Sequence, residues 1–446
     1  MGYTAKDILA LAKKENVRFV NYQFTDMLGV PKAVTQPATE LDAAIDGGVW
    51  FDGSSIEGFT RIFESDMYLK ADLDTWTVIP WTRGGDGVTA RLICDVYMPD
   101  GKPFEGDPRF ILKNQVAKAS ALGYKFNTGP ELEFFLFKRN GDVPTTTPHD
   151  SAGYFDLMTD EAHEIRQEMT RAMQDFGIRV EALHHEVALG QHEIDFRYGD
   201  AVTCADNAIT MKYILKTIAK RHGLHCTFMP KPIAGINGSG MHVHQSLFSP
   251  DGKKNFFFDP KDKYHISTLA KSYIAGQMKH IQAMNAIMNP TVNSYKRLVV
   301  GYEAPVYVAW GQRNRSALIR IPRYTPGKDK AVRAELRCPD PTANPYLAFA
   351  VMLAAGLDGI KKKMTPPAPV EENIFEFTLE TAAKHGITTV AKNLLDALDA
   401  LKADSVVREA LGEFTFQKFY EAKMAEWDEY RLNVSQWELD KYLEIF

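Results

Sequence analysis

Two acidic residues interrupt the otherwise apolar segment 129–137, which reads Gly-Pro-Glu-Leu-Glu-Phe-Phe-Leu-Phe. Because side chains alternate between the two faces of a β-strand, Glu131 and Glu133 share one face while Leu132 and Phe134 lie on the other. Two adjacent carboxylates repel each other and are costly to bury unpaired, so a divalent cation would stabilise them. Taken alone, such a short motif is more typical of an edge strand with one solvated face.

Three further segments combine a polar face with an apolar one, and they lie at residues 181–193, 237–246 and 332–337. Their polar side chains are Glu181, Glu186 and Glu193, then His242, His244 and Ser246, then Arg333, Glu335 and Arg337. A single histidine is more often a structural residue than a ligand. Four separate strands with this contrast are harder to explain as solvated edges, and we predict that they form the walls of one funnel.

The candidate ligands are carboxylates and histidines without a nearby thiolate, which favours Mg²⁺ or Mn²⁺ over Zn²⁺. Arginines are frequent in the second half of the chain: Arg297, Arg313, Arg315, Arg320, Arg323, Arg333 and Arg337. The guanidinium group binds carboxylates and phosphates with two parallel N–H groups. Phosphoryl transfer uses carboxylates that bind a metal ion and cationic side chains that bind phosphate, and the sequence offers both.

Familiar nucleotide-binding motifs are absent from the sequence. It has no Walker A motif, no kinase glycine loop and no G-x-G-x-x-G motif between a strand and a helix. The residues alone therefore predict a metal-dependent, ATP-using enzyme with an anionic substrate, and they identify no particular reaction.

Composition limits the class of protein. Hydrophobic residues make up 45% and charged residues 24% of the 446 residues, as in a globular protein of two or three domains. The longest apolar run, 346–355, is shorter than the ~20 residues of a membrane-spanning helix, and no secretory signal is visible. The four cysteines are widely separated and the net charge is −5. We expect a cytoplasmic protein with no nucleic acid and no membrane as partner.

The first hundred residues are expected to form a small domain of their own. Strands are predicted at 17–24 and 89–97 with a short helix at 41–45, and the turn-rich segment 99–103 is the predicted boundary. Longer helices are predicted at 205–222, 266–288 and 345–363. Strands and helices are interspersed without regular βαβ spacing, so we predict an α+β fold.

Six motifs resemble those of type I glutamine synthetase, and the resemblance runs from about residue 16 to the C-terminus. They are DGSS at 52–55, GPELE at 129–133, NGSGMH at 237–242, GYEAP at 301–305, NRSALIRIP at 314–322 and ELRCPD at 335–340. The resemblance implies a glutamate–ammonia ligase that works through γ-glutamyl phosphate and releases glutamine, ADP and phosphate. It also implies a β-grasp domain at 1–103 and a catalytic domain at 104–446 with a curved antiparallel sheet flanked by helices.

The resemblance implies two or more Mg²⁺ or Mn²⁺ ions in each active site. One metal site corresponds to Glu133, Glu186 and Glu193, and the other to Glu131, His242 and Glu335. ATP would contact Glu181, Tyr198, His244, Ser246, Arg320 and Arg333. Glutamate would contact Asn237, Gly238, Arg297, Glu303 and Arg337. These assignments account for the alternating faces described above.

Further residues would act in the reaction itself. Ammonium is protonated at neutral pH, so a carboxylate must bind it and accept a proton, and the resemblance assigns this role to Asp52. It implies that Tyr154 lines the ammonium pocket, that Glu303 shields the intermediate from water, and that Arg315 and Arg320 neutralise the phosphoryl group.

Two alternatives belong to the same superfamily: a glutamate–amine ligase of the polyamine type, and an inactive regulatory relative. The first usually alters the ammonium pocket, and the second is expected to lose metal ligands. Asp52, Tyr154 and Glu303 are all present here, as are all six candidate ligands. The sequence therefore favours the ammonia ligase.

Assembly and regulation also follow from the resemblance. The family forms a dodecamer of two stacked hexamers with active sites between subunits, where Asp52 comes from the neighbour. Arg61 resembles the short class that product glutamine inhibits, and nitrogen-regulatory proteins are candidate partners. Phe375 stands where the longer class carries an adenylylated tyrosine, so we expect no adenylylation. The segment 426–446 ends in an amphipathic helix that is expected to insert into the opposite ring.

Overall fold

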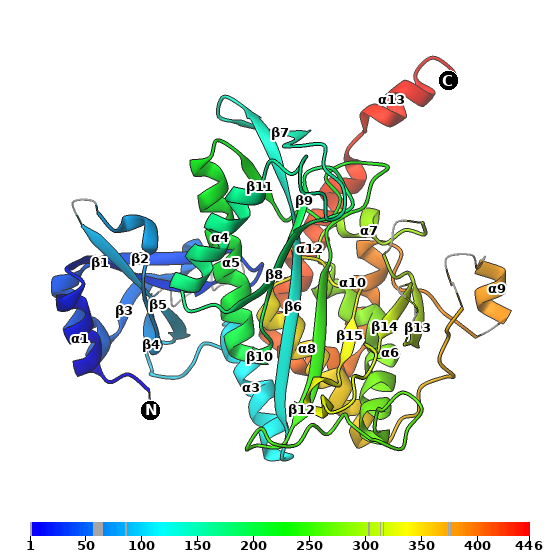
Figure 1. Cartoon of the computed structure of the whole chain (residues 1–446), viewed down its shortest axis with the longest axis horizontal. Helices are drawn as coiled ribbons and strands as arrows, with labels where there is room; N and C mark the ends of the chain where they lie inside the picture. The colour runs from blue at the N-terminus through cyan, green and yellow to red at the C-terminus, as the bar shows by residue number, and fades with distance from the viewer. Residues whose placement is uncertain are drawn as a thin grey trace.

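Two β-sheets organise the chain, a smaller one near the N-terminus and a larger one in the remainder (Figure 1). The computed structural model describes residues 2–56, 66–84, 87–301, 304–312, 314, 316–372, 374, 377, 379–384 and 386–446. Each sheet packs on its own hydrophobic core. The α+β class predicted from the sequence is confirmed.

The smaller sheet contains five strands in the order β2-β1-β5-β4-β3. They are β1 Val17–Thr25, β2 Pro31–Pro37, β3 Val49–Asp52, β4 Asp66–Val78 and β5 Val88–Tyr97. β1 and β5 are parallel neighbours, and the other pairs are antiparallel. Two helices, α1 Ala5–Lys14 and α2 Leu41–Gly47, bury apolar side chains in the same core as the strands. Both predicted strands and the predicted short helix of this region are confirmed.

The larger sheet follows the order β13-β14-β15-β12-β6-β9-β8, and three short strands pair with β6 beside this path. Its strands are β6 Lys125–Asn140, β7 Val143–Pro148, β8 Val180–His185, β9 Gln191–Phe196, β10 Gly199–Asp200, β11 His225–Thr227, β12 Met241–Phe248, β13 Tyr307–Gly311, β14 Ala317–Arg320 and β15 Ala334–Leu336. The expected antiparallel sheet needs one correction, because β13 and β14 run parallel. Only residues 312–316 separate these two strands along the chain, and so short a connection ordinarily joins antiparallel neighbours, so local sequence reasoning does not predict a parallel pair here.

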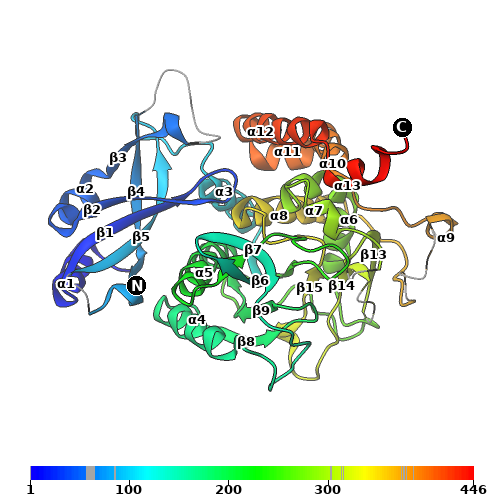
Figure 2. The same cartoon turned by 90° about the horizontal axis from the view of Figure 1, so that it is seen from above.

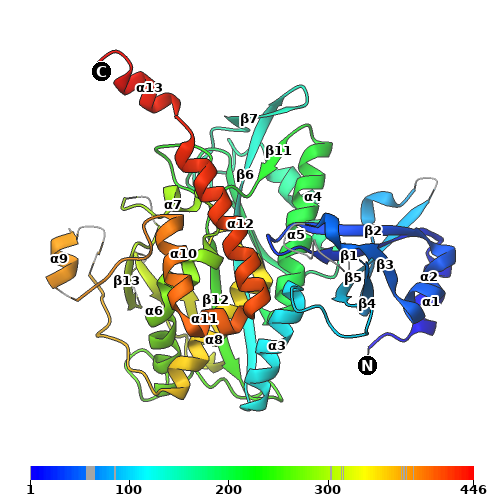
Figure 3. The ribbon, with the colours of Figure 1, turned by 180° about the vertical axis from the view of Figure 1, so that it is seen from behind.

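Helices cover one face of the larger sheet, as the views from above and from behind show (Figures 2 and 3). Two helices, α9 Leu379–Lys384 and α13 Gln436–Tyr442, lie away from this layer (Figures 1 and 3). The helices of the layer are α3 Pro108–Ala121, α4 His163–Asp175, α5 Ala201–Arg221, α6 Thr268–Met288, α7 Ser294–Arg297, α8 Pro345–Lys361, α10 Leu394–Ala403, α11 Ser405–Leu411 and α12 Glu413–Leu432. The apolar side chains of β6, among them Leu132 and Phe134, share one core with these helices. The opposite face of β6 can therefore present polar side chains.

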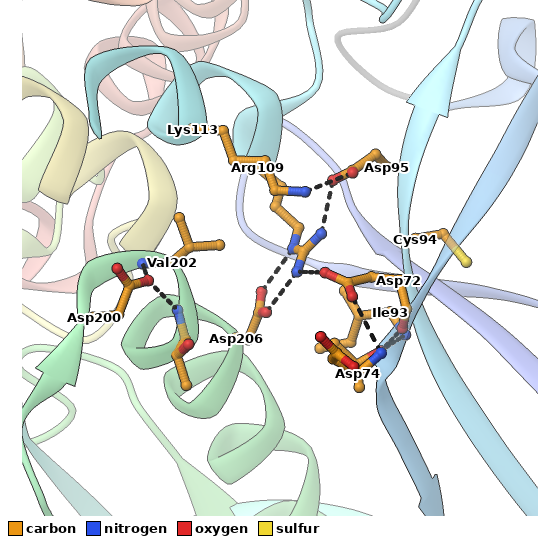
Figure 4. Close-up of polar contacts among 12 residues, drawn as sticks. Asp72, Asp74, Ile93, Cys94, Asp95, Arg109, Lys113, Asp200, Val202 and Asp206 are labelled. Carbon is orange, nitrogen blue, oxygen red and sulfur yellow. Dashed lines mark hydrogen bonds and ion pairs between the residues drawn. The ribbon is translucent and has the colours of Figure 1, made fainter. Parts of the chain in front are cut away.

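Side-chain caps set where the long helices begin. Asp200 accepts hydrogen bonds from the amides of Val202 and Thr203 at 3.1 and 3.4 Å, so α5 begins four residues before the predicted start (Figure 4). Ser267 caps α6 in the same way. α8 begins at the predicted proline, Pro345, directly after its cap.

A buried arginine joins the two parts of the chain (Figure 4). Arg109 of α3 donates to both carboxylate oxygens of Asp206 on α5, at 3.0 and 2.9 Å. It also donates to Asp95 of β5 at 2.8 Å and to Asp72 of β4 at 2.7 Å. Lys113 adds a second cation to Asp95 at 2.6 Å. The smaller sheet is thus held to the helices of the larger domain by charge-assisted bonds.

The C-terminal helix α13 projects away from the rest of the chain (Figures 1 and 3). No residue of α13 is buried, and the apolar side chains of Trp437, Leu443 and Phe446 are exposed. Among the described helices, none combines the length and the apolar character needed to cross a membrane.

Candidate active site

Strand β6 places the two acids of the Glu-x-Glu motif at the centre of the larger sheet. Glu131 is the register partner of His242 on β12, and Glu133 is the register partner of Glu193 on β9. The intervening Leu132 is fully buried on the other face. The predicted alternation is therefore confirmed, and the edge-strand alternative is wrong, because β6 is paired on both sides.

The first group of candidate ligands, called here the histidine cluster, consists of Glu131, His242 and Glu335. Each offers one ligand atom, and these atoms lie within 4.8 Å of one another. His242 Nδ1 is 3.6 Å from Glu131 Oε2 and 3.7 Å from Glu335 Oε1. Glu335 is fully buried, accepts a hydrogen bond from Arg337 Nη1 at 2.6 Å and also contacts Arg320.

Neighbouring charges set the ionisation of the histidine cluster. Burial would raise the pKa of Glu131, but His244, 2.7 Å away, and His242 outweigh burial and lower it. Burial likewise opposes ionisation of Glu335, and His244 together with Arg337 lowers its pKa. Burial and Arg337 lower the pKa of His242 to about 4. Two carboxylates and a neutral imidazole are thus present at neutral pH, which is the state that a metal ligand requires.

The second group, the three-glutamate cluster, consists of Glu133, Glu186 and Glu193, whose ligand atoms also lie within 4.8 Å of one another. Glu133 Oε2 accepts hydrogen bonds from Gly240 N at 2.8 Å and Gln191 Nε2 at 3.0 Å. A carboxylate held by two donors on one oxygen keeps its other oxygen free to face the cluster.

Mutual repulsion dominates the electrostatics of the three-glutamate cluster. Burial and the charge of Glu186 raise the pKa of Glu133 to about 8. Burial, with Asp195 and Glu133 nearby, raises the pKa of Glu193 to about 12. Three acids arranged this way require either protons or a cation. An all-oxygen donor set fits a hard divalent cation such as Mg²⁺ or Mn²⁺.

The segment 181–193 is not a single strand, which corrects the picture of four strands. It forms the hairpin of β8 and β9, and Glu186 lies in the connection directly after β8. The amide of Glu186 donates to the carbonyl of Gln191 at 2.8 Å, which closes the turn. The turn brings Glu186 next to Glu133, although Glu186 is not part of a strand and no alternating pattern predicts where it lies.

A cavity of about 460 Å³ adjoins the histidine cluster. Of the six predicted ATP contacts, five line it: Glu181, Tyr198, His244, Ser246 and Arg333. Arg333 Nε donates to His244 Nδ1 at 3.1 Å, which fixes the imidazole between this arginine and Glu131. Arg320 instead lies against Glu335. The cavity therefore joins the predicted nucleotide contacts to the histidine cluster.

A smaller cavity of about 40 Å³ lies beside the three-glutamate cluster. Its lining includes Asn237, Gly238, Arg297 and Arg337, which are the predicted glutamate contacts within the described residues. A Cβ atom at Gly238 would lie 2.2 Å from the carbonyl oxygen of Pro230, so only glycine fits there. The predicted substrate contacts thus lie together next to the candidate metal ligands.

The remaining predicted site residues lie away from the two cavities or outside the residues that the structure describes. Asp52 ends β3 in the smaller sheet, is exposed, and lines neither cavity of its own chain. Tyr154 packs edge-on against His184, whose Nε2 lies 3.2 Å from Glu193. Three further predictions, on Glu303, Arg315 and Arg61, fall outside the described residues, and so does Phe375.

Several site residues were missed by the sequence reasoning. Asp195 follows Glu193 by two residues on β9, lies opposite Glu131, and has its pKa raised to about 7 by burial and by Glu131. Strand alternation from Glu193 could have found it. Lys328 and Lys330 line the larger cavity from the short 3-10 helix Asp329–Ala331 and the residue before it, and no periodic signal marks them.

Family models cover nearly the whole chain. Residues 16–99 match the model described as "Glutamine synthetase, beta-Grasp domain", and residues 105–442 match "Glutamine synthetase, catalytic domain". The five-stranded sheet β1–β5 and the larger sheet fall within these two matches.

Full-length relatives carry the same name. A protein of Thermus thermophilus named "Glutamine synthetase" is 53% identical over 451 residues and covers 100% of both chains. One of Clostridium saccharobutylicum, with the same name, is 53% identical over 447 residues, covering 100% of this chain and 99% of the relative. A solved structure described as "GmaS/ADP complex-Conformation 1" is 32% identical with a TM-score of 0.89, covering 98% of this chain and 99% of that one.

Proposed function

The chain belongs to the glutamine synthetase family, and from this premise we propose how its residues divide the work of the reaction. The protein is an ATP-dependent glutamate–ammonia ligase. The γ-carboxylate of glutamate attacks the γ-phosphorus of ATP, which forms γ-glutamyl phosphate and releases ADP. The lone pair of ammonia then attacks the acyl carbon, phosphate leaves, and the nitrogen loses one proton, giving glutamine. We propose the domain boundary near residue 103, between the two family matches.

Both clusters are proposed to hold divalent cations, Mg²⁺ or Mn²⁺, at least two in each site. Their donor sets support this, because carboxylate oxygens and one neutral imidazole suit such ions. When bound, such cations neutralise phosphate charge and orient the two substrates. The raised pKa values of Glu133 and Glu193 support the second site in particular, because a cation would remove their mutual repulsion.

The larger cavity is the proposed ATP site. Tyr198 offers an aromatic face for the base, Ser246 a hydroxyl, and Arg333 a guanidinium for phosphate. Glu181 and His244 complete this contact set. Arg320, next to Glu335, supplies positive charge where the phosphoryl group moves, together with Arg315.

The smaller cavity is the proposed glutamate site. Arg337, which already donates to Glu335, is placed to bind a substrate carboxylate. Arg297 is buried, and its Nη1 donates to the carbonyl of Cys338 at 2.8 Å, so its guanidinium is fixed before substrate binds. Asn237 and Gly238 add an amide side chain and a close backbone approach.

Asp52 is the proposed acceptor of the ammonium proton, supplied by a neighbouring subunit. The hydrogen bond from Ser54 lowers its pKa, so the carboxylate is ionised at neutral pH and can bind a cation. Its distance in the fold from both cavities of its own chain supports a site shared between subunits. Tyr154 and Glu303 complete the ammonium pocket, and Glu303 with Arg61 of the neighbour holds product glutamine.

The exposed helix α13 supports assembly into a dodecamer of two stacked hexamers. Four buried free cysteines support a reducing, cytoplasmic setting. Nitrogen-regulatory proteins are the proposed protein partners, and this rests on the family resemblance alone.

The observation that carries the proposal is that six candidate ligands from four strands and a turn converge as two clusters on one face of one sheet. The test is glutamine formation by Glu335→Ala with saturating Mg²⁺, using ammonium or methylamine as nucleophile. We expect loss of turnover, with the exposed Glu429→Ala as a control at full activity. Turnover at the wild-type level in Glu335→Ala would refute the metal assignment. Equal use of methylamine and ammonium by the wild type would favour a glutamate–amine ligase.

A further inference from the structure

Behind the three-glutamate cluster lies a buried polar network that the reaction scheme does not use. Its members are Asp150 after β7, Asp160 before α4, Arg166 on α4, His185 on β8 and His192 on β9. The side chains of all five are at most 2% exposed. Five polar side chains buried this deeply need partners for their donors and acceptors.

Arg166 fixes the protonation of His192. Its guanidinium makes a two-pronged contact with Asp160, in which Nη1 is 2.9 Å from Oδ1 and Nη2 contacts Oδ2. The same Nη1 is 2.9 Å from His192 Nδ1. A guanidinium can only donate, so Nδ1 of His192 accepts and the ring proton stays on Nε2. His192 is therefore a neutral imidazole held by α4.

His185 connects the network to the turn. Its Nε2 lies 3.0 Å from Asp150 Oδ1, and its Nδ1 lies 2.6 Å from the backbone carbonyl oxygen of Glu186. Both partners are acceptors, so both ring nitrogens donate. The rings of His185 and His192 also pack edge to face, with centroids 4.6 Å apart.

The network is not a third metal site, although Asp150, His185 and His192 bring ligand-type atoms within 4.8 Å of one another. His192 Nδ1 is occupied by Arg166, and its Nε2 carries the proton. Both nitrogens of His185 donate to protein oxygens. No lone pair of either ring is left for a cation, and the buried guanidinium adds a repelling charge.

We propose that the Asp150–His185–His192 network positions Glu186 and Glu193 for the three-glutamate cluster, an inference that rests on the metal role proposed above. Glu186 lies outside the strands, and its amide is held by the carbonyl of Gln191, whereas its own carbonyl makes no strand-pairing bond within the described residues. The Nδ1 hydrogen bond of His185 fixes its carbonyl, and the adjacent Val187 amide donates to Glu186 Oε2 at 3.0 Å. His192 directly precedes Glu193 on β9 and anchors that strand to α4.

The test is a Mn²⁺ binding isotherm of the assembled protein, read by electron paramagnetic resonance of free Mn²⁺. Glu186→Gln and His242→Gln are reference variants, and each should remove one class of sites. In His185→Ala and in Asp150→Ala, the class of sites that Glu186→Gln removes should bind Mn²⁺ about 10–100-fold more weakly. Residues that hydrogen-bond to metal ligands typically contribute that factor to metal affinity. The class lost in His242→Gln should keep its affinity.

Two comparisons separate positioning from a general loss of stability. Asp150→Asn keeps an oxygen acceptor for His185, so it should recover affinity to within about 3-fold of wild type. If His185→Ala fails to fold, the difference between Asp150→Asn and Asp150→Ala decides alone. His222→Ala is the matched control, because His222 forms an exposed pair with Glu168 of the same helix α4 at 2.7 Å.

The outcomes distinguish this inference from the function it rests on. Unchanged Mn²⁺ binding in folded His185→Ala and Asp150→Ala, or equal weakening of both classes, would overturn the positioning role alone. If Glu186→Gln removes no class of sites, the metal assignment itself is wrong. Activity at rising Mn²⁺ gives a second readout: a positioning role predicts a raised KM for the metal and a kcat that recovers at saturation.

Discussion

Glu133 and Glu193 face each other as direct partners in the antiparallel register of β6 and β9. Both side chains point to the polar face of the sheet, and burial raises the pKa of each, to about 8 and about 12. For an acid with a raised folded-state pKa, the folded state is penalised as the pH rises above the unfolded value of about 4.5. Metal-free protein should therefore lose stability as the pH rises above about 5, up to about pH 8 through Glu133 and beyond pH 8 through Glu193.

Glu193→Gln removes one of these two acids, and it should raise stability while it abolishes activity. In excess chelator at pH 8, the variant should be more stable to urea than the wild type by about 1–3 kcal/mol, with a smaller gain at pH 5. Glutamine formation should be lost, because the cluster then has too little charge for the cation. Glu429→Gln is the exposed control. Equal urea midpoints at both pH values would show that the acids do not repel each other in the folded chain.

Arg109 should be the most costly single residue at the contact between the two sheets. Arg109→Met leaves Asp72, Asp95 and Asp206 without their shared partner. We expect a loss of about 3–5 kcal/mol in the free energy of unfolding, because breaking a buried ion pair leaves charges uncompensated. Lys113→Met, which removes a half-exposed cation from Asp95, should cost less than about 1 kcal/mol. Equal costs for the two variants would contradict this ranking.

His280 should make stability depend on pH at a place remote from the reaction. Its Nδ1 lies 2.6 Å from Asp404 and its Nε2 lies 3.0 Å from Asp358, and these bonds raise its pKa although burial opposes them. The stabilisation is complete below the unfolded pKa of about 6.5 and is lost as the pH rises through the higher folded value.

The measurement is the difference in unfolding free energy between wild type and His280→Asn as a function of pH. We expect about 1–2 kcal/mol at pH 6, decreasing towards pH 9. His222→Asn, at an exposed pair, should show little change across the same range. A difference that is constant with pH would mean that packing, and not charge, accounts for the role of His280.

Deleting residues 435–446 should change assembly without unfolding the subunit. The deletion removes α13, of which no residue is buried, so the thermal midpoint should change by about 1 °C or less. Mass photometry should then show single rings in place of the proposed dodecamer. A full-length variant with serine at Trp437, Leu443 and Phe446 tests the apolar contact itself. Twelve-subunit particles in both variants would show that this helix does not join the rings.

The candidate site was predictable from sequence where its residues alternate along one strand. Glu131 and Glu133 on β6, and His242 and His244 on β12, follow the period of two. Glu186 does not, because its position depends on the turn between β8 and β9; the segment containing it was singled out from the residues, but only the family resemblance assigned it to a metal site. Lys328 and Lys330 line the larger cavity at a single-turn 3-10 helix, which is too short to show a periodic pattern.

The fold, like the site, was predictable only where a local sequence pattern marks it. The apolar periodicity of α5 marks its body, but Asp200 sets its true start through side-chain bonds that hydrophobic periodicity does not include. The parallel pairing of β13 and β14 is a contact between segments whose connection carries no hairpin signal. Local patterns therefore identified the elements, whereas the exact start of a helix and the direction of strand pairing depend on contacts in the folded chain.

The register of strand β6 against its neighbours decides which of its side chains lie in the core. Slipping β6 by one residue against β12 and β9 would turn Leu132 and Phe134 into the funnel and drive Glu131 and Glu133 into the apolar core. If the two clusters hold cations as proposed, a chain paired in that register would bind neither of them. Only molecules with the correct strand register would then gain stability from metal binding.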